Sequence, residues 1–141
     1  MLNIIIFSRD RSCQLELLLR SMKLYFEEFY DHKINILYTY SNDKFREGYE
    51  KLFKIHNNKN INYVREVRGF KEHLLLLIDP ENKYTVFFVD DVVFKNRFSL
   101  KSKQFELFKG DENILPLSLR LHPYLTNSYP PRLNMLSPKV N

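Results

Sequence analysis

The sequence predicts an α/β domain with a mostly parallel central sheet flanked by helices. Short apolar runs rich in β-branched residues alternate with longer segments whose apolar residues recur at helical spacing, which is the pattern of repeated β–α–β units. The apolar runs are continuous, as in strands that are buried on both faces of a parallel sheet. A chain of 141 residues is long enough for one such domain with its own core.

The first buried strand is predicted over residues 2–7, which include three consecutive isoleucines. A polar break follows, and then a helix whose apolar side chains run from Leu15 to Phe29 at helical spacing, with an end expected at residues 31–33. The next elements are a strand over 34–38, a helix opened by the cap-like cluster Ser41-Asn42-Asp43, a strand over 61–64, a helix over 70–78 and a strand over 84–89.

The periodicity weakens after Asp91. Residues 92–94 are predicted to extend the fourth strand, residues 102–108 to form a short helix, and residues 117–121 to form a half-buried strand. The prolines beyond residue 121 predict an irregular tail. The α/β domain is therefore expected over residues 1–121 and the tail over residues 122–141.

The composition narrows the kinds of ligand. A net charge of +5 favours anionic ligands, but the basic residues are scattered, so the sequence does not predict nucleic-acid binding. Three glycines are too few and too dispersed for a P-loop or a dinucleotide fingerprint, which need clustered glycines next to phosphate. A phosphorylated ligand must therefore be held by side chains, a helix N-terminus or a metal ion.

The single cysteine and the lengths of the apolar runs predict the cellular compartment, and the positions of two histidines predict their exposure. Cys13 is the one cysteine, which fits a reducing compartment, and no apolar run is long enough to span a bilayer, so a cytoplasmic location is expected. A peripheral membrane association and a homo-oligomer are both compatible with the sequence. His32 and His56 lie in polar segments and are expected at the surface.

Three polar clusters follow predicted strands. Ser8-Arg9-Asp10 follows the first strand, Ser41-Asn42-Asp43 the second, and Asp90-Asp91 the fourth. Parallel strands place their carboxyl ends at one edge of the sheet, which is where open α/β sheets bind ligands. Two adjacent carboxylates repel each other and need a cation or hydrogen-bond donors to offset their charge. A divalent metal that also holds phosphate would fit this pair.

These segments resemble a known family. The run from Asn3 to Arg11 with the helix after it, the run Tyr38–Asp43, and the run Phe87–Phe94 with its acid pair resemble a GT-A glycosyltransferase of the family 2-like kind. The acid pair resembles the DXD region of that fold. The resemblance covers about residues 2–121 and implies a Rossmann-like fold that binds nucleotide sugars.

The resemblance also implies roles for single residues. Ser8, Arg9 and Asp43 would hold the base and ribose, Asp90 would lie on the nucleotide side, and Asp91 would bind Mn²⁺ or Mg²⁺. Lys71 would contact base or phosphate, ahead of Arg65 and Arg68. The implied partners are a nucleotide-diphosphate sugar, with a UDP-sugar favoured, and an acceptor that is a glycan, lipid or protein.

The catalytic base of a transferase is not identified. The last carboxylates of the chain are Asp111 and Glu112, and the acceptor half of such an enzyme normally supplies this base. Three readings follow: a metal-dependent glycosyltransferase or its donor-binding portion; a catalytically inactive nucleotide-binding or partner-subunit module of the same fold; and a phosphoryl-transfer or receiver-like domain. The third is disfavoured because the acid pair follows the fourth strand and not the first.

Overall fold

The computed structural model describes residues 2–82, 84–101 and 106. The chain divides into two compact units, Met1–Leu100 and Lys101–Asn141, and the fold below is that of the first. The elements predicted over 102–108 and 117–121, and the tail over 122–141, lie outside the described residues, with the exception of Glu106.

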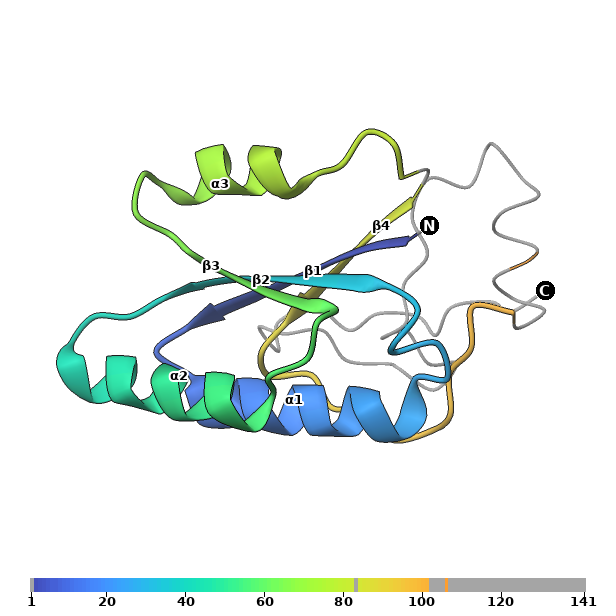
Figure 1. Cartoon of the computed structure of the whole chain (residues 1–141), viewed down its shortest axis with the longest axis horizontal. Coiled ribbons are helices and arrows are strands. Elements are labelled where there is room, and N and C mark those ends of the chain that lie inside the picture. Colours follow the sequence, from blue (N-terminus) through green and yellow to red (C-terminus); the bar gives the residue numbers. More distant parts are fainter. Residues whose placement is uncertain (1, 83, 102–105, 107–141) are drawn as a thin grey trace, which may run out of the picture. The chain divides into compact units, whose positions relative to one another are not determined.

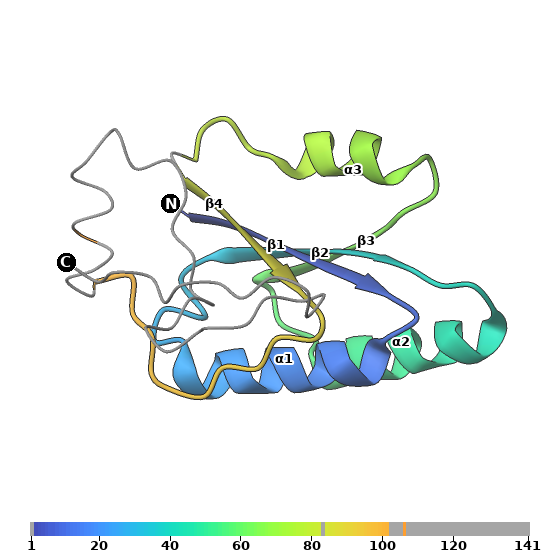
Figure 2. The ribbon, with the colours of Figure 1, turned by 180° about the vertical axis from the view of Figure 1, so that it is seen from behind.

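The described part of the chain contains a parallel sheet of four strands in the order β3-β2-β1-β4. The strand bounds are Leu2–Arg9 for β1, Lys33–Thr39 for β2, Ile61–Arg65 for β3 and Tyr84–Val89 for β4. Helices α1 and α2 cover one face of this sheet and α3 lies on the other (Figures 1 and 2). Their bounds are Ser12–Tyr25 for α1, Asp43–Ile55 for α2 and Phe70–Leu77 for α3. The predicted α/β fold class is therefore confirmed.

The centre of the sheet is the apolar run of β1. Ile4, Ile5 and Ile6 are at most 1% exposed. β1 pairs in register with β2 on one side and with β4 on the other, so it is shielded at both edges as well as on both faces. Complete burial of such side chains is the main favourable term in folding.

The first helix ends earlier than predicted. It stops at Tyr25, because Phe26 adopts extended backbone angles with φ −92° and ψ 108°. Phe26 and Phe29 are nevertheless buried, in the turns that follow the helix. The apolar spacing thus predicted burial correctly and the helix end incorrectly, since a tight turn can bury the same side chains.

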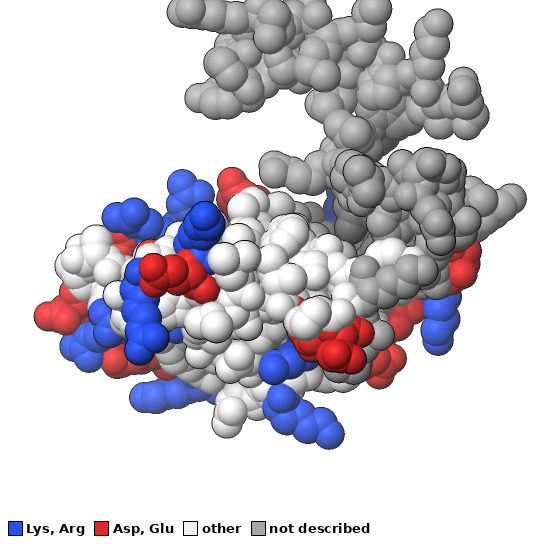
Figure 3. All heavy atoms as spheres, turned by 90° about the horizontal axis from the view of Figure 1, so that it is seen from above, with Lys and Arg blue, Asp and Glu red and all other residues white. Residues whose placement is uncertain are grey.

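Aromatic side chains pack on the face of the sheet that carries α3. Phe7 of β1 packs edge-on against Phe70 at a centroid distance of 5.0 Å and stacks on Phe87 of β4 at 5.8 Å, which holds the start of α3 against the sheet. Figure 3 looks onto this face and shows the charged side chains mainly around its margins. Leu75 and Leu76 of α3 remain exposed. Within the described residues, no helix is long and apolar enough to cross a membrane.

Three asparagines form a hydrogen-bonded ladder across the strands beneath α3. The amide of Asn62 donates to Asn35 at 3.0 Å, and the amide of Asn35 donates to Asn3 at 3.1 Å. Asn3 in turn donates to the carbonyl of Leu77 at 2.7 Å. Because Asn3 and Asn35 are buried, these bonds satisfy side chains that would otherwise be costly inside the fold, and they tie the end of α3 to the sheet.

Asn35→Ala is expected to lower the free energy of unfolding by about 2–4 kcal/mol, because both buried Asn3 and Asn62 lose their hydrogen bonds to the Asn35 side chain. Urea denaturation followed by circular dichroism measures this change. Asn62→Ala, at the exposed end of the ladder, is the matched control and should cost about 1 kcal/mol. Equal losses in the two variants would contradict the ladder as a cooperative unit.

One histidine differs from its expected position. His56 caps the C-terminus of α2 and is 6% exposed, so the prediction of a surface location is wrong. Its Nε2 lies 3.5 Å from the carboxylate of Glu16 on α1. Burial lowers the pKa of His56 below its ordinary value of 6.5, and the nearby Glu16 opposes that effect only in part. The neutral imidazole is therefore favoured in the folded protein at neutral pH.

Stability should fall as the pH drops below 6.5. A group whose pKa is lowered by folding contributes stability above its unfolded pKa and loses it as the pH falls, because the unfolded chain takes up the proton first. Urea midpoints at about pH 7.5 and about pH 5.5 bracket this ionisation. His56→Gln should reduce the pH dependence without removing it, since burial also lowers the pKa of His32. An unchanged slope in the variant would contradict this assignment.

Candidate functional site

The carboxyl edge of the sheet brings together polar residues from three segments of the chain. The carboxylate of Asp10, after β1, accepts a hydrogen bond from the backbone N–H of Ser41, after β2, at 2.7 Å. The Nη1 atom of Arg11 lies 3.6 Å from Asp90 and 4.0 Å from Asp91, which follow β4. The predicted gathering of these polar loops at one sheet edge is therefore observed.

The turn after β1 has an unusual backbone. Asp10 has φ 57°, in the left-handed region that aspartate tolerates better than most residues. Its N–H donates to the carbonyl of Thr39 at 3.2 Å, while its carboxylate binds the N–H of Ser41. Asp10 therefore joins the ends of β1 and β2, and this linkage sets where the next residue, Arg11, projects.

Tyr49 of α2 braces the same turn from beneath. Its hydroxyl lies 2.7 Å from the Ser8 hydroxyl and accepts a hydrogen bond from the backbone N–H of Arg11 at 3.3 Å. Burial raises the pKa of Tyr49, so the hydroxyl stays protonated and can donate to Ser8. Tyr49 was not among the site residues predicted from the sequence. The signal was present, because a buried tyrosine normally needs a partner for its hydroxyl.

The two aspartates after β4 differ in exposure. Asp90 is 5% exposed, and its N–H donates to the carbonyl of Phe7 at 3.1 Å, whereas the Asp91 side chain is 53% exposed. The predicted extension of the strand over residues 92–94 is wrong. The chain turns after Val89, and the N–H of Phe94 donates to the Ser21 hydroxyl of α1 at 3.0 Å. The acid pair is thus fixed between β1 and α1.

The remaining predicted residues lie around this pair. Ser8 is buried against Tyr49, and Arg9 is exposed at the end of β1. Asp43 begins α2, is 85% exposed, and its carboxylate accepts from Nε of Arg46 at 3.1 Å. The N-cap of α2 is Asn42 and not Asp43, since its side chain accepts from the N–H of Phe45. Lys71 is exposed in the first turn of α3.

A cation and an aromatic ring stack beside this edge. The guanidinium of Arg65, at the end of β3, lies 4.2 Å from the centre of the Tyr40 ring, which follows β2. Tyr40 precedes Ser41, the residue bonded to Asp10. Arg65, a secondary candidate in the sequence, therefore lies at the same edge as the primary ones.

The carboxylates of Asp90 and Asp91 suit a metal ion whose other coordination positions are filled by a bound ligand and water. Among the residues that the structure describes, no group of three or more histidine, cysteine, aspartate and glutamate side chains converges on one point. Asp90 and Asp91 thus supply two carboxylate ligands, which do not complete the coordination shell of a metal ion. Mg²⁺ is commonly held by one or two carboxylates together with phosphate oxygens and water, and this pair fits that arrangement.

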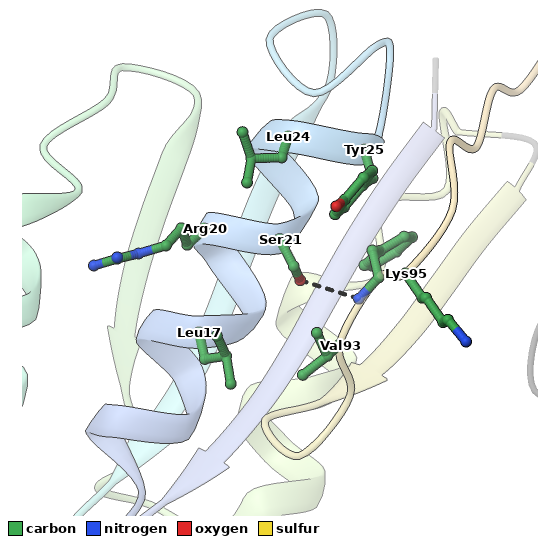
Figure 4. Close-up of a pocket in the computed structure, with 8 residues that line it drawn as sticks. Leu17, Arg20, Ser21, Leu24, Tyr25, Val93 and Lys95 are labelled. Carbon is green, nitrogen blue, oxygen red and sulfur yellow. Dashed lines mark hydrogen bonds between the residues drawn. The ribbon is translucent and has the colours of Figure 1, made fainter.

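A groove of about 530 Å³ runs elsewhere, between α1 and residues 93–95 (Figure 4). Its walls include the exposed side chains of Leu17, Leu24 and Val93, and the hydrogen bond from Phe94 to Ser21 crosses it. Neither Asp90 nor Asp91 lines it. A largely apolar groove without these carboxylates does not match a phosphorylated ligand, so the candidate site is the carboxyl edge of the sheet.

Comparisons with known proteins add one relative. The chain is 33% identical over 108 residues to the protein named bifunctional glycosyltransferase pgtA of Dictyostelium discoideum. The aligned region covers 71% of this chain and 14% of that relative's length. No protein-family profile matches the chain, and no solved structure matches it. The similarity supports the predicted resemblance to glycosyltransferases, while the family 2-like kind stays a prediction.

Asp10→Ala is expected to lower the free energy of unfolding by about 1–3 kcal/mol, because it removes the acceptor for Ser41 and places alanine at a positive φ. Thermal or urea denaturation measures the change. Asp10→Asn is the control: it keeps an acceptor oxygen and tolerates the left-handed conformation, so it should lose less stability than the alanine variant. The opposite order would contradict the structural role assigned to Asp10.

Proposed function

We propose that this chain binds a nucleotide-diphosphate sugar together with Mn²⁺ or Mg²⁺ at the carboxyl edge of its sheet, as a metal-dependent glycosyltransferase or its donor-binding portion. The observation that carries the proposal is the acid pair after β4, held beside Arg11 at the end of the central strand. The similarity to a glycosyltransferase, although it spans 14% of that protein, supports the same conclusion.

The two acids have different roles in this proposal. Asp91, half-exposed, can reach a hydrated metal ion and is the metal ligand. Asp90 is buried and held by the backbone of β1, so it supplies a fixed negative charge on the nucleotide side. The metal would neutralise the diphosphate leaving group as the bond to the sugar breaks, which lowers the energy of the charge that develops there.

The nucleotide would lie along the ends of β1 and β2. Arg9 and Asp43 are both exposed at this edge and would contact the base and ribose, with Lys71 reaching base or phosphate from the start of α3. Ser8 contributes by fixing the turn through Tyr49. We favour UDP as the nucleotide. The acceptor would be a glycan, a lipid or a protein, and no residue is assigned as the base that activates it.

Wild-type protein is expected to bind UDP in the presence of Mn²⁺, and Asp91→Ala should weaken this metal-dependent binding by about 100-fold, because it removes the exposed metal ligand. Isothermal titration calorimetry with and without metal measures the effect. Asp31→Ala is the matched control, since Asp31 is an exposed aspartate just before β2, at the opposite edge of the sheet. It should bind as the wild type does.

Wild-type protein that binds neither UDP nor GDP with Mn²⁺ present would contradict the proposed function. Equal affinities in wild type and Asp91→Ala would contradict the metal role of Asp91 alone. Turnover needs a separate measurement, in which UDP- and GDP-sugars are incubated with the protein and released nucleotide is quantified. Binding without transfer or donor hydrolysis would favour the inactive nucleotide-binding module over the enzyme.

A further inference from the structure

Arg11 faces both carboxylates of the acid pair. Its Nη1 atom lies 3.6 Å from an oxygen of Asp90 and 4.0 Å from an oxygen of Asp91. These separations are longer than the 2.7–2.9 Å of a direct hydrogen bond between a guanidinium and a carboxylate. The arginine side chain is also 53% exposed, so water weakens the attraction. The guanidinium therefore balances the acids without being locked to them.

The backbone of Arg11, in contrast, is fixed. Its N–H donates to the hydroxyl of Tyr49 at 3.3 Å, and its carbonyl accepts the first hydrogen bond of α1, from Leu15 at 3.0 Å. The preceding residue, Asp10, is held by two bonds to the end of β2. A loosely paired side chain on a rigid backbone can change partners without moving the loop that carries it.

The charges around the acid pair indicate when the Arg11 side chain would change partners and which new partner it would take. Two carboxylates and one guanidinium leave a net charge of about −1, which a divalent cation would reverse if the arginine stayed in place. Two cations at the same carboxylates repel each other, so a metal ion must compete with Arg11. A diphosphate adds negative charge beside the metal, and a guanidinium binds phosphate oxygens in bidentate fashion.

We propose that Arg11 is the resident counter-ion of Asp90 and Asp91, that a divalent metal displaces it, and that the released guanidinium then binds the diphosphate. This inference rests on the proposed function. Its consequence is that the metal ion and the nucleotide bind cooperatively. The bare metal must overcome the arginine, whereas the metal–nucleotide pair gives the arginine a new partner. Linkage makes this coupling reciprocal, so each ligand raises the affinity for the other.

The test compares wild type with Arg11→Gln, which removes the charge at a half-exposed position. Free Mn²⁺ measured by electron paramagnetic resonance gives the affinity for the metal alone, and calorimetry gives the affinity for UDP at saturating Mn²⁺. Arg11→Gln should bind Mn²⁺ alone roughly 3–10-fold more tightly and UDP with Mn²⁺ roughly 10-fold more weakly. Circular dichroism and a urea midpoint confirm that the variant is folded.

Arg20→Gln is the matched control. It removes the same charge from α1, the helix that Arg11 caps, about 14 Å along the helix axis. Arg20 pairs with Glu16 at 2.7 Å and not with the acid pair. Both affinities should stay within about twofold of the wild type. A uniform change in both variants would show that net charge alone is responsible and would overturn the specific role of Arg11.

Three failures can be told apart. Wild-type protein that binds UDP with Mn²⁺ while Arg11→Gln leaves the affinity for Mn²⁺ alone unchanged, or lowers it, overturns the counter-ion role and leaves the proposed function standing. Wild-type protein that binds no UDP with Mn²⁺ overturns the proposed function and, with it, the coupling. Tighter Mn²⁺ binding by Arg11→Gln with undiminished UDP affinity overturns the transfer of the guanidinium to the diphosphate.

Discussion

The parallel pairing of β1 with a strand on each side organises this fold and its polar edge. The register joins Phe7 to Leu37 of β2 and to Val89 of β4, so three strands end at nearly the same level. The polar segments that follow them are then adjacent in space, although Arg11 and Asp90 are far apart in the sequence. Without the pairing of β1 with β4, the acid pair and Arg11 would have no common location.

The site is built on a rigid frame with one adjustable charge. Asp10, Tyr49 and the N–H of Asp90 are committed to bonds that hold the loops in place. Arg11 has a fixed backbone and a half-exposed side chain at long range from both acids. This division is what a site needs if its loops are to be preorganised while its charge balance responds to an anionic ligand and a metal ion.

Two faces of the sheet are stabilised in different ways. The face under α1 and α2 is a conventional apolar core, in which Leu15, Leu18 and Leu19 are completely buried. The face under α3 combines the asparagine ladder with the ring contacts of Phe7. The ladder holds the end of α3, and Phe70 holds its start. Together they keep the first turn of α3, which carries Lys71, close to the carboxyl edge.

The sequence alone predicted the fold class, the seven helices and strands of the described residues, and the edge where the polar loops meet. It could do so because continuous apolar runs and helical spacing are local signals, and because parallel strands necessarily share a carboxyl edge. It also named most of the residues that lie there: Ser8, Arg9, Asp43, Asp90, Asp91 and, as a secondary candidate, Arg65.

The way in which these residues are used depends on tertiary contacts. Partners from distant segments determine it: Tyr49 takes up the Ser8 hydroxyl, Arg46 pairs with Asp43, and Arg11 lies against both acids. The same applies to His56, whose polar sequence context predicted exposure, but which packs beside Glu16 of another helix. Burial and partner choice depend on long-range packing, which no local pattern encodes.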